Sequence, residues 1–124
     1  MGTRMTNQKL KIFEYLEGVY THPTAQQVFD AVKKDLPAIT LATVYRNLNL
    51  LADQGKILRF EAGKEYRYDA DTRLHQHAVC KSCGKIFDLH KKGVSTFAMK
   101  KLDIAGFEAE SVDVIFHGKC KGCN

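Results

Sequence analysis

The residues best suited to chemistry in this sequence are four cysteines that occur as two closely spaced pairs. Cys80 and Cys83 form the first pair, Cys120 and Cys123 form the second, and 36 residues separate the two. Two intervening residues let a tight turn aim both thiolates at one ion, and two such turns complete a tetrahedral shell of four sulfurs, a common structural zinc site. Such a shell leaves no open position, so we predict a structural zinc. The alternative is two redox-active dithiols.

Histidines and aspartates form a second group of candidate metal ligands. His75 and His77 are two residues apart, so on an extended segment both side chains face the same way. The other candidates lie in a connection or where a predicted strand ends: His22, Asp69 and Asp88. Spacing alone leaves open whether these five side chains converge on one ion.

Three helices are expected in the first part of the chain. Thr6 can cap the first helix, Thr24 and Gln27 form a capping box for the second, and Thr40 can cap a third that runs to about Gln54. Two strands follow, joined by a tight turn. Three helices and a hairpin in this order predict a winged helix-turn-helix.

The third helix is a candidate reader of DNA. Its apolar residues recur at helical spacing, so they share one face of the helix. The opposite face is rich in hydrogen-bonding side chains and carries no charge except that of one arginine. Such side chains can bond base edges in the major groove or hold phosphates. The residues assigned to this face are Thr43, Tyr45, Arg46, Asn47 and Asn49. The alternative is an ordinary solvated amphipathic helix.

The second part of the chain is expected to form a small α/β lobe. We predict strands over 85–89 and 112–116 and a helix over 94–102, with Phe97 and Leu102 among its inward residues. The fold class is therefore α+β, with a winged-helix domain over 1–70 and a zinc-stapled dimerisation and metal-sensing domain over 71–124. A lobe this small has little core, so zinc and a second copy are expected to stabilise it.

Composition and charge exclude several other classes of protein. Of the 124 residues, 44% are hydrophobic and 27% charged, and no apolar run approaches the ~20 residues of a membrane-spanning helix. No secretion signal opens the chain, so we expect a soluble, cytoplasmic protein. The match of Gly2 to a myristoylation pattern is taken as accidental. The net charge of +5 is compatible with nucleic acid but does not demand it.

Taken together, these motifs resemble the ferric-uptake-regulator (Fur) family. The resemblance covers residues 39–48 of the third helix, the segment from His75 through Lys85, and the closing cysteine pair. It implies a dimeric, metal-dependent transcriptional regulator that binds palindromic operator DNA. It also implies that His22, Asp69, His75, His77 and Asp88 ligate a regulatory Fe(II) or Mn(II) ion. The chain departs from the family at Asn7 and Lys9, and it lacks the leading helix of many members.

Within this family the sequence is most similar to the peroxide-regulator branch. Asp69 is an aspartate where iron-uptake members typically have glutamate. The ligands of a further site in iron-uptake members are absent at four positions: Leu74, Gln76, Ser95 and Val112. Similarity to this branch implies that bound Fe(II) reacts with hydrogen peroxide and that a ligating histidine, His22 or His75, is then oxidised.

Other functions remain as alternatives. One is a repressor of the same family that senses the level of iron or manganese. Another, from a different class, is a zinc-stabilised thiol redox switch or protein-interaction module. An enzyme is disfavoured, because a ligand set at a hinge in so short a chain does not favour turnover. We assign His90 to a solvated loop, and His117 to support of the zinc shell or packing in the sheet.

Overall fold

The structure is a computed structural model that describes residues 6–73 and 75–124. Two sequence expectations, those that concern Gly2 and Leu74, lie outside the described residues. The chain divides into two compact units, the first ending at Thr72 and the second beginning at Arg73. Among the described residues, no helix is both long and apolar enough to cross a membrane.

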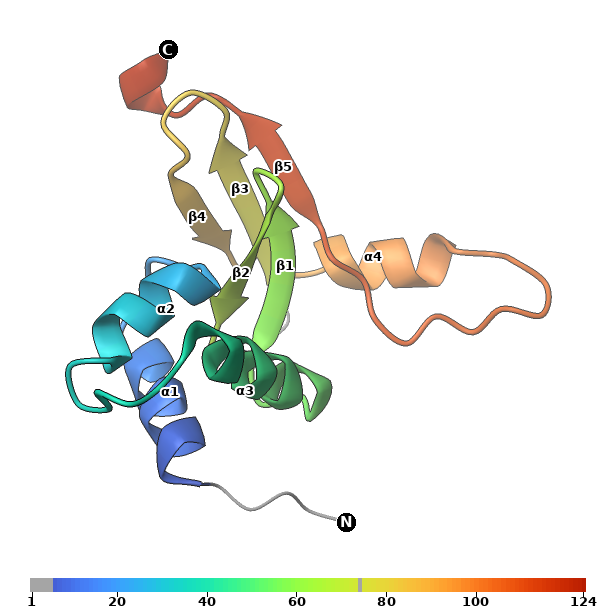
Figure 1. The fold of residues 1–124 in the computed structure, drawn as a ribbon. Helices are drawn as coiled ribbons and strands as arrows, with labels where there is room; N and C mark the ends of the chain where they lie inside the picture. The colour runs from blue at the N-terminus through green and yellow to red at the C-terminus, as the bar shows by residue number, and fades with distance from the viewer. Residues whose placement is uncertain (1–5, 74) are drawn as a thin grey trace. The chain divides into compact units, whose positions relative to one another are not determined.

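Three capped helices begin the first unit (Figure 1): α1 (Asn7–Glu17), α2 (Ala25–Val32) and α3 (Leu41–Asp53). Each begins after a threonine whose side chain accepts a backbone N–H three residues later, as the sequence predicts. At α2 the side chain of Gln27 also accepts the backbone N–H of Thr24, which completes the capping box. The helix starts are therefore set by local hydrogen bonds.

A two-stranded antiparallel hairpin follows the helices. Strands β1 (Leu58–Ala62) and β2 (Glu65–Asp69) pair with Leu58 opposite Asp69 and Ala62 opposite Glu65. The turn between them places both Gly63 and Lys64 at positive φ. All three helices contribute to one buried apolar core, which Tyr68 of β2 joins with 1% of its surface exposed. This unit is the predicted winged helix-turn-helix.

The second unit is built on a three-stranded sheet (Figure 1). Its elements are β3 (Gln76–Cys80), β4 (Ile86–Leu89), α4 (Val94–Lys101), β5 (Ile115–Gly118) and a 3-10 turn, η1 (Lys121–Cys123). The strand order is β4-β3-β5, with β3 antiparallel to β4 and parallel to β5. Strand β3 was not among the expected elements, and the last strand begins three residues later than expected.

Two of the residues expected to face inward from the helix of the second unit are exposed, whereas the other two, Val94 and Ala98, are half-buried. Phe97 is 62% exposed and Leu102 is 42% exposed. The physical reason is that Cys80 is the one buried apolar residue among the described residues of this unit, so there is no core for them to enter. The sequence pattern located the helix but not which of its apolar residues are covered.

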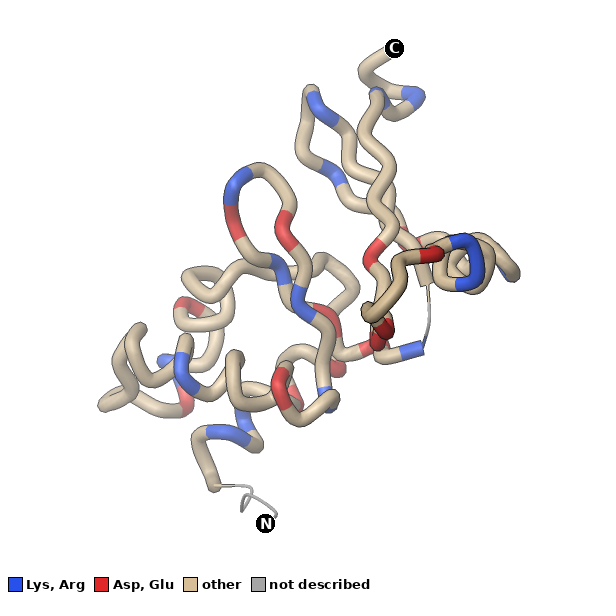
Figure 2. Tube along the Cα trace, turned by 90° about the vertical axis from the view of Figure 1, so that its right-hand side faces the viewer, with Lys and Arg blue, Asp and Glu red and all other residues tan. Residues whose placement is uncertain are grey.

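Charge is distributed differently along the two units. In the hairpin of the first unit, basic and acidic residues alternate (Figure 2). In the second unit, the segments around the cysteine pairs carry lysines and no acidic residue over 78–87 and 114–124. The segments around the cysteines are therefore net positive.

Candidate metal centres and DNA-binding face

The four cysteines of the second unit form one cluster. Cys80 ends β3, and the antiparallel turn into β4 returns Cys83 beside it, while the β5–η1 turn supplies Cys120 and Cys123. All four sulfurs lie within 4.8 Å of one another, and the Cys83 and Cys120 sulfurs are 3.8 Å apart. A tetrahedral zinc–thiolate site with ~2.3 Å bonds has sulfurs about 3.8 Å apart. The donor set therefore fits zinc.

Backbone N–H groups prepare one of these sulfurs to be a thiolate. Cys80 is 2% exposed, and its sulfur accepts the backbone N–H groups of Cys120 at 3.4 Å and Cys83 at 3.5 Å. These donors, Cys120 first, lower the pKa of the Cys80 thiol to about 5. The neighbouring thiols, that of Cys120 first, raise the pKa of Cys123 to about 12. The backbone at this turn therefore favours the thiolate form of Cys80, the form that binds zinc.

Three of the predicted regulatory ligands meet within the second unit. His77 on β3 lies directly opposite Asp88 on β4, and their Nε2 and Oδ1 atoms are 3.3 Å apart. His75 Nε2 lies 3.4 Å from the same oxygen and 3.1 Å from His77 Nε2. The other nitrogen of His75, Nδ1, donates to the carbonyl of Arg73 at 2.6 Å. That bond leaves the Nε2 lone pair of His75 pointing at its neighbours, as metal-ligating histidines require.

The other two predicted ligands meet within the first unit. His22, in the connection between α1 and α2, places Nε2 3.4 Å from Oδ2 of Asp69 at the end of β2. The imidazole is 3% exposed, and the Phe60 ring packs edge-on against it with centroids 5.9 Å apart. The structure thus brings the five residues together in two groups. One is the pair of His22 and Asp69, and the other is the trio of His75, His77 and Asp88. Nitrogen and carboxylate oxygen donors without thiolates fit Fe(II) or Mn(II).

Two of the positions at which the sequence lacks ligands of a further metal site, Gln76 and Ser95, contact each other in the structure. Gln76 and Ser95 are both buried, and the Gln76 amide donates to the Ser95 hydroxyl at 3.0 Å. The Gln76 carbonyl oxygen accepts the Lys91 backbone N–H at 3.0 Å. These two side chains tie β3 to the start of α4 by hydrogen bonds.

One aromatic neighbour of the trio was missed. His90 is exposed, as a loop residue should be, but its ring stacks on that of His75 with centroids 4.8 Å apart and planes 23° apart. His90 lies two residues after Asp88, and the period of two in a strand could have indicated the same face.

The exposed face of α3 differs in part from expectation. Tyr45 and Arg46 are exposed, and Arg46 donates to the Thr43 hydroxyl at 3.5 Å. Asn47, expected to face outward, is only 7% exposed, so its assignment to the DNA-contacting face is wrong. It lies beside Leu48 and Leu51 on the helix, within the stripe that packs on the core. Asn49 is exposed, but its oxygen accepts a 2.9 Å hydrogen bond from Arg59 of β1.

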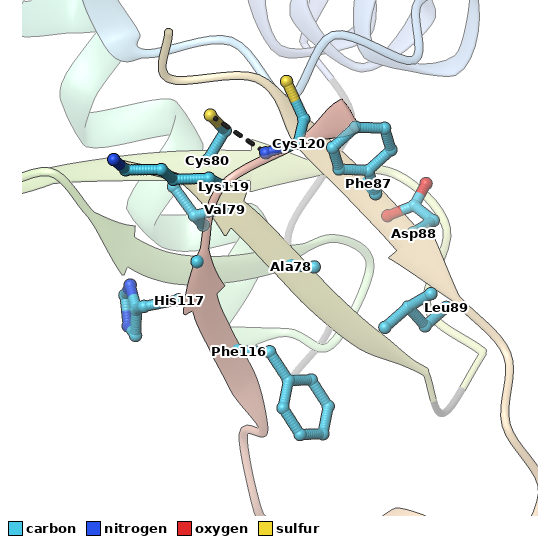
Figure 3. A pocket seen from close by; sticks show the side chains of 11 residues that line it. Ala78, Val79, Cys80, Phe87, Asp88, Leu89, Phe116, His117, Lys119 and Cys120 are labelled. Carbon is cyan, nitrogen blue, oxygen red and sulfur yellow. Dashed lines mark hydrogen bonds between the residues drawn. The ribbon is translucent and has the colours of Figure 1, made fainter. Parts of the chain in front are cut away.

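An apolar hollow of about 390 Å³ lies against the sheet of the second unit (Figure 3). Ala78 of β3 pairs with Phe87 of β4 and with Phe116 of β5, so one small residue stands between two aromatic ones. His117 lines this hollow, which places it in the sheet rather than in the zinc shell. Phe116 is 49% exposed, so the hollow opens to solvent in a single chain.

Comparisons with known proteins show which family the chain belongs to. Residues 1–117 match the model of the ferric uptake regulator family. The peroxide operon regulator of Bacillus subtilis strain 168 is 33% identical over 124 residues, which covers 99% of this chain and 86% of the relative. The Campylobacter jejuni peroxide stress regulator has a crystal structure that superposes with a TM-score of 0.76 at 32% identity, covering 94% of this chain and 88% of that one.

A ferric uptake regulator from Francisella tularensis, whose structure was solved with iron, is 25% identical, with a TM-score of 0.78 over 99% of this chain and 96% of that one. The folds therefore agree over nearly the whole length of each chain. The winged helix, the first cysteine pair and the histidine–aspartate groups lie within residues 1–117, which the family model matches. This protein belongs to the ferric uptake regulator family.

Proposed function

We propose that this protein is a metal-dependent transcriptional repressor that responds to peroxide. The observation that carries the proposal is a pair of preformed ligand groups, His22 with Asp69 and the trio at Asp88, in a chain similar over its full length to peroxide regulators. In this proposal these side chains ligate the regulatory metal. Metal binding favours the DNA-binding state, because that state binds the metal better.

The proposed ligand residues have two roles, to bind the metal and to react when peroxide is present. Asp69 and Asp88 supply negative charge, and the three imidazoles supply nitrogen donors, a set suited to Fe(II) or Mn(II). Ferrous iron held by these side chains would reduce peroxide by one electron, whereas Mn(II) would be a far poorer reductant. The imidazoles of His22 and His75 are the side chains expected to gain an oxygen atom, which peroxide would supply. An oxidised imidazole binds metal poorly, so the metal-bound state that binds DNA would be lost.

The repressor acts on double-stranded palindromic operator DNA, as a homodimer in the cytoplasm. Tyr45 and Arg46 of α3 are exposed and can reach base edges or phosphates, and Thr43 orients Arg46. The second unit exposes large apolar side chains that a second copy can cover: Phe97, Ile104, Phe107 and Phe116. In this proposal the four-cysteine zinc stabilises the sheet of that unit. The protein regulates and does not turn over a substrate.

The test measures DNA binding by the zinc-loaded, full-length protein in several metal states. A duplex selected from a random library with the Mn(II) form serves as the operator. We expect tight binding with Mn(II) or Fe(II), weak binding without either, and loss of binding only in the Fe(II) form after peroxide. Mass spectrometry should find one added oxygen on His22 or His75.

A matched pair of variants controls for general damage. Asp69→Asn removes a proposed ligand charge, whereas Asp30→Asn makes the same change at an exposed carboxylate that pairs with Lys33. Only Asp69→Asn should weaken metal-dependent DNA binding. Binding that needs metal but survives peroxide would make the protein a sensor of metal level. Oxidation confined to cysteines, with loss of zinc, would favour a thiol switch.

A further inference from the structure

The backbone that presents His22 adopts an unusual conformation. Its φ angle is +54°, a region that L-residues other than glycine rarely adopt. The next residue is Pro23, which disfavours helical and turn-like conformations in the residue before it. A strained backbone of this kind persists when surrounding contacts hold it. The contacts around His22 therefore decide whether its imidazole stays in place.

Strand β2 of the wing supplies two of those contacts. The guanidinium of Arg67 donates from Nη1 to the carbonyl oxygen of His22 at 3.3 Å. The backbone N–H of Tyr68 donates to the carbonyl oxygen of Pro23 at 3.0 Å. Arg67 also lies opposite Phe60 in the hairpin, and it is the Phe60 ring that packs against the imidazole. The His22 loop is thus attached to the hairpin through its carbonyl groups and its ring.

Stability alone does not account for an arginine at this position. The Nε atom of Arg67 is buried and has no hydrogen-bond partner among the described residues. A buried donor without a partner is costly, and an apolar side chain of similar length would avoid that cost. What arginine adds is the bond to the carbonyl of His22. Arg67 also lies two residues from Asp69, so β2 carries both the carboxylate that pairs with the His22 imidazole and the guanidinium that bonds the His22 carbonyl.

We propose that Arg67 is a positioning residue for the regulatory metal site. It holds the carbonyl of His22 so that the imidazole remains aimed at Asp69. The proposal rests on the proposed function, because it assumes that His22 ligates the metal. It adds a route for the response: His22 is attached directly to the wing, so a change at this ligand reaches the DNA-binding unit through the hairpin.

The experiment measures Mn(II) affinity of the zinc-loaded, full-length protein by competition with a fluorescent chelator. Arg67→Met should weaken binding by about 10–100-fold, as is typical when a partner of a ligand is removed. Arg67→Lys keeps a donor and should recover most of the affinity. Arg59→Met makes the same change on the neighbouring strand, where the guanidinium contacts Asn49 and the Tyr66 ring, and should leave Mn(II) affinity unchanged.

A double-mutant cycle separates positioning from general structural damage. If Arg67 acts through His22, Arg67→Met should cost no further Mn(II) affinity in a His22→Ala background. With Co(II) in the regulatory site, the visible absorption bands should shift relative to the wild-type protein. The shift should have the same direction in Arg67→Met and in His22→Ala. In protein that holds zinc but no regulatory metal, Arg67→Met should not lower the temperature of thermal unfolding.

The outcomes distinguish this proposal from the one on which it rests. If His22→Ala weakens Mn(II) binding but Arg67→Met does not, the positioning role is wrong and the metal site stands. Additive losses in the double variant would likewise overturn it. If His22→Ala leaves Mn(II) affinity intact, the assignment of the regulatory ligands itself fails.

Discussion

Replacing Cys80 by serine should unfold the second unit while leaving the winged helix intact. The variant removes the most buried of the four thiolates and substitutes a hydroxyl that stays neutral near pH 7. It also leaves the N–H groups of Cys83 and Cys120 facing a weaker acceptor. The reason for expecting a large effect is that Cys80 is also the one buried apolar residue among the described residues of that unit.

The size of the effect follows from comparing two free energies. A folded unit of the length of Arg73–Asn124 has a stability of about 3–8 kcal/mol at ~0.05–0.15 kcal/mol per residue. A structural zinc contributes an apparent ~10–16 kcal/mol. Loss of the ion therefore removes more free energy than the whole unit has. Because each ~1.4 kcal/mol is a tenfold factor, amide protection in β3, β4 and β5 should fall by about 10²–10⁶-fold.

Hydrogen exchange read by mass spectrometry provides the assay, with native mass spectrometry to count zinc. Amides in the core helices of the first unit, α1 and α3, should keep their protection, which serves as an internal control. The dimer should be lost together with the sheet. A Cys80→Ser protein that remains a dimer with a protected, zinc-free sheet would refute the structural assignment of the cysteines.

Three further predictions concern the other sites. Arg46→Ala should weaken binding to the selected operator by about 1–3 kcal/mol without changing metal content, and an equal loss on random DNA would make Arg46 a phosphate contact only. Leu48→Ala opens a cavity in the first unit, where Leu48 is fully buried, and should lower its free energy of unfolding by about 2–5 kcal/mol in chemical denaturation. Acidification should release zinc, because protons compete with the ion for the thiolates. Backbone N–H donors lower the pKa of the Cys80 thiol to about 5, so this buried ligand becomes protonated only as the pH approaches that value. The stability that zinc adds is thus present at neutral pH and lost as the pH falls toward 5, which a chromogenic chelator can follow.

Features set by neighbours in the chain were predictable from the sequence. The three helix starts depend on threonines that bond to groups three residues away, and all three are as expected. The cysteine cluster was predictable because two-residue spacing leaves few geometries. The burial of Asn47 could not be predicted from its polarity. It lies about 40° from Leu51 on a helical wheel, so its position on the helix places it on the buried side.

Features set by distant contacts were not predictable in the same way. Phe97 and Leu102 follow a helical pattern, yet what covers them is not local, and a single chain leaves them exposed. The support of His22 by Arg67 joins residues 45 positions apart, and no short motif encodes it. The proposed ligands follow from family resemblance. Strand register places His77 opposite Asp88, whereas His22 reaches Asp69 from a connection between helices.

The parallel pairing of β3 with β5 also sets the order in which a new chain matures. His77 pairs with Ile115, so the sheet and its zinc shell cannot be completed until the end of the sequence has left the ribosome. The helices of the first unit make short-range contacts and fold far sooner. At ~5–20 residues per second, about 2–8 s pass between synthesis of the first cysteine pair and the second. During that interval Cys80 and Cys83 lack their partners, so a four-thiolate site can form only after Cys120 and Cys123 have been synthesised.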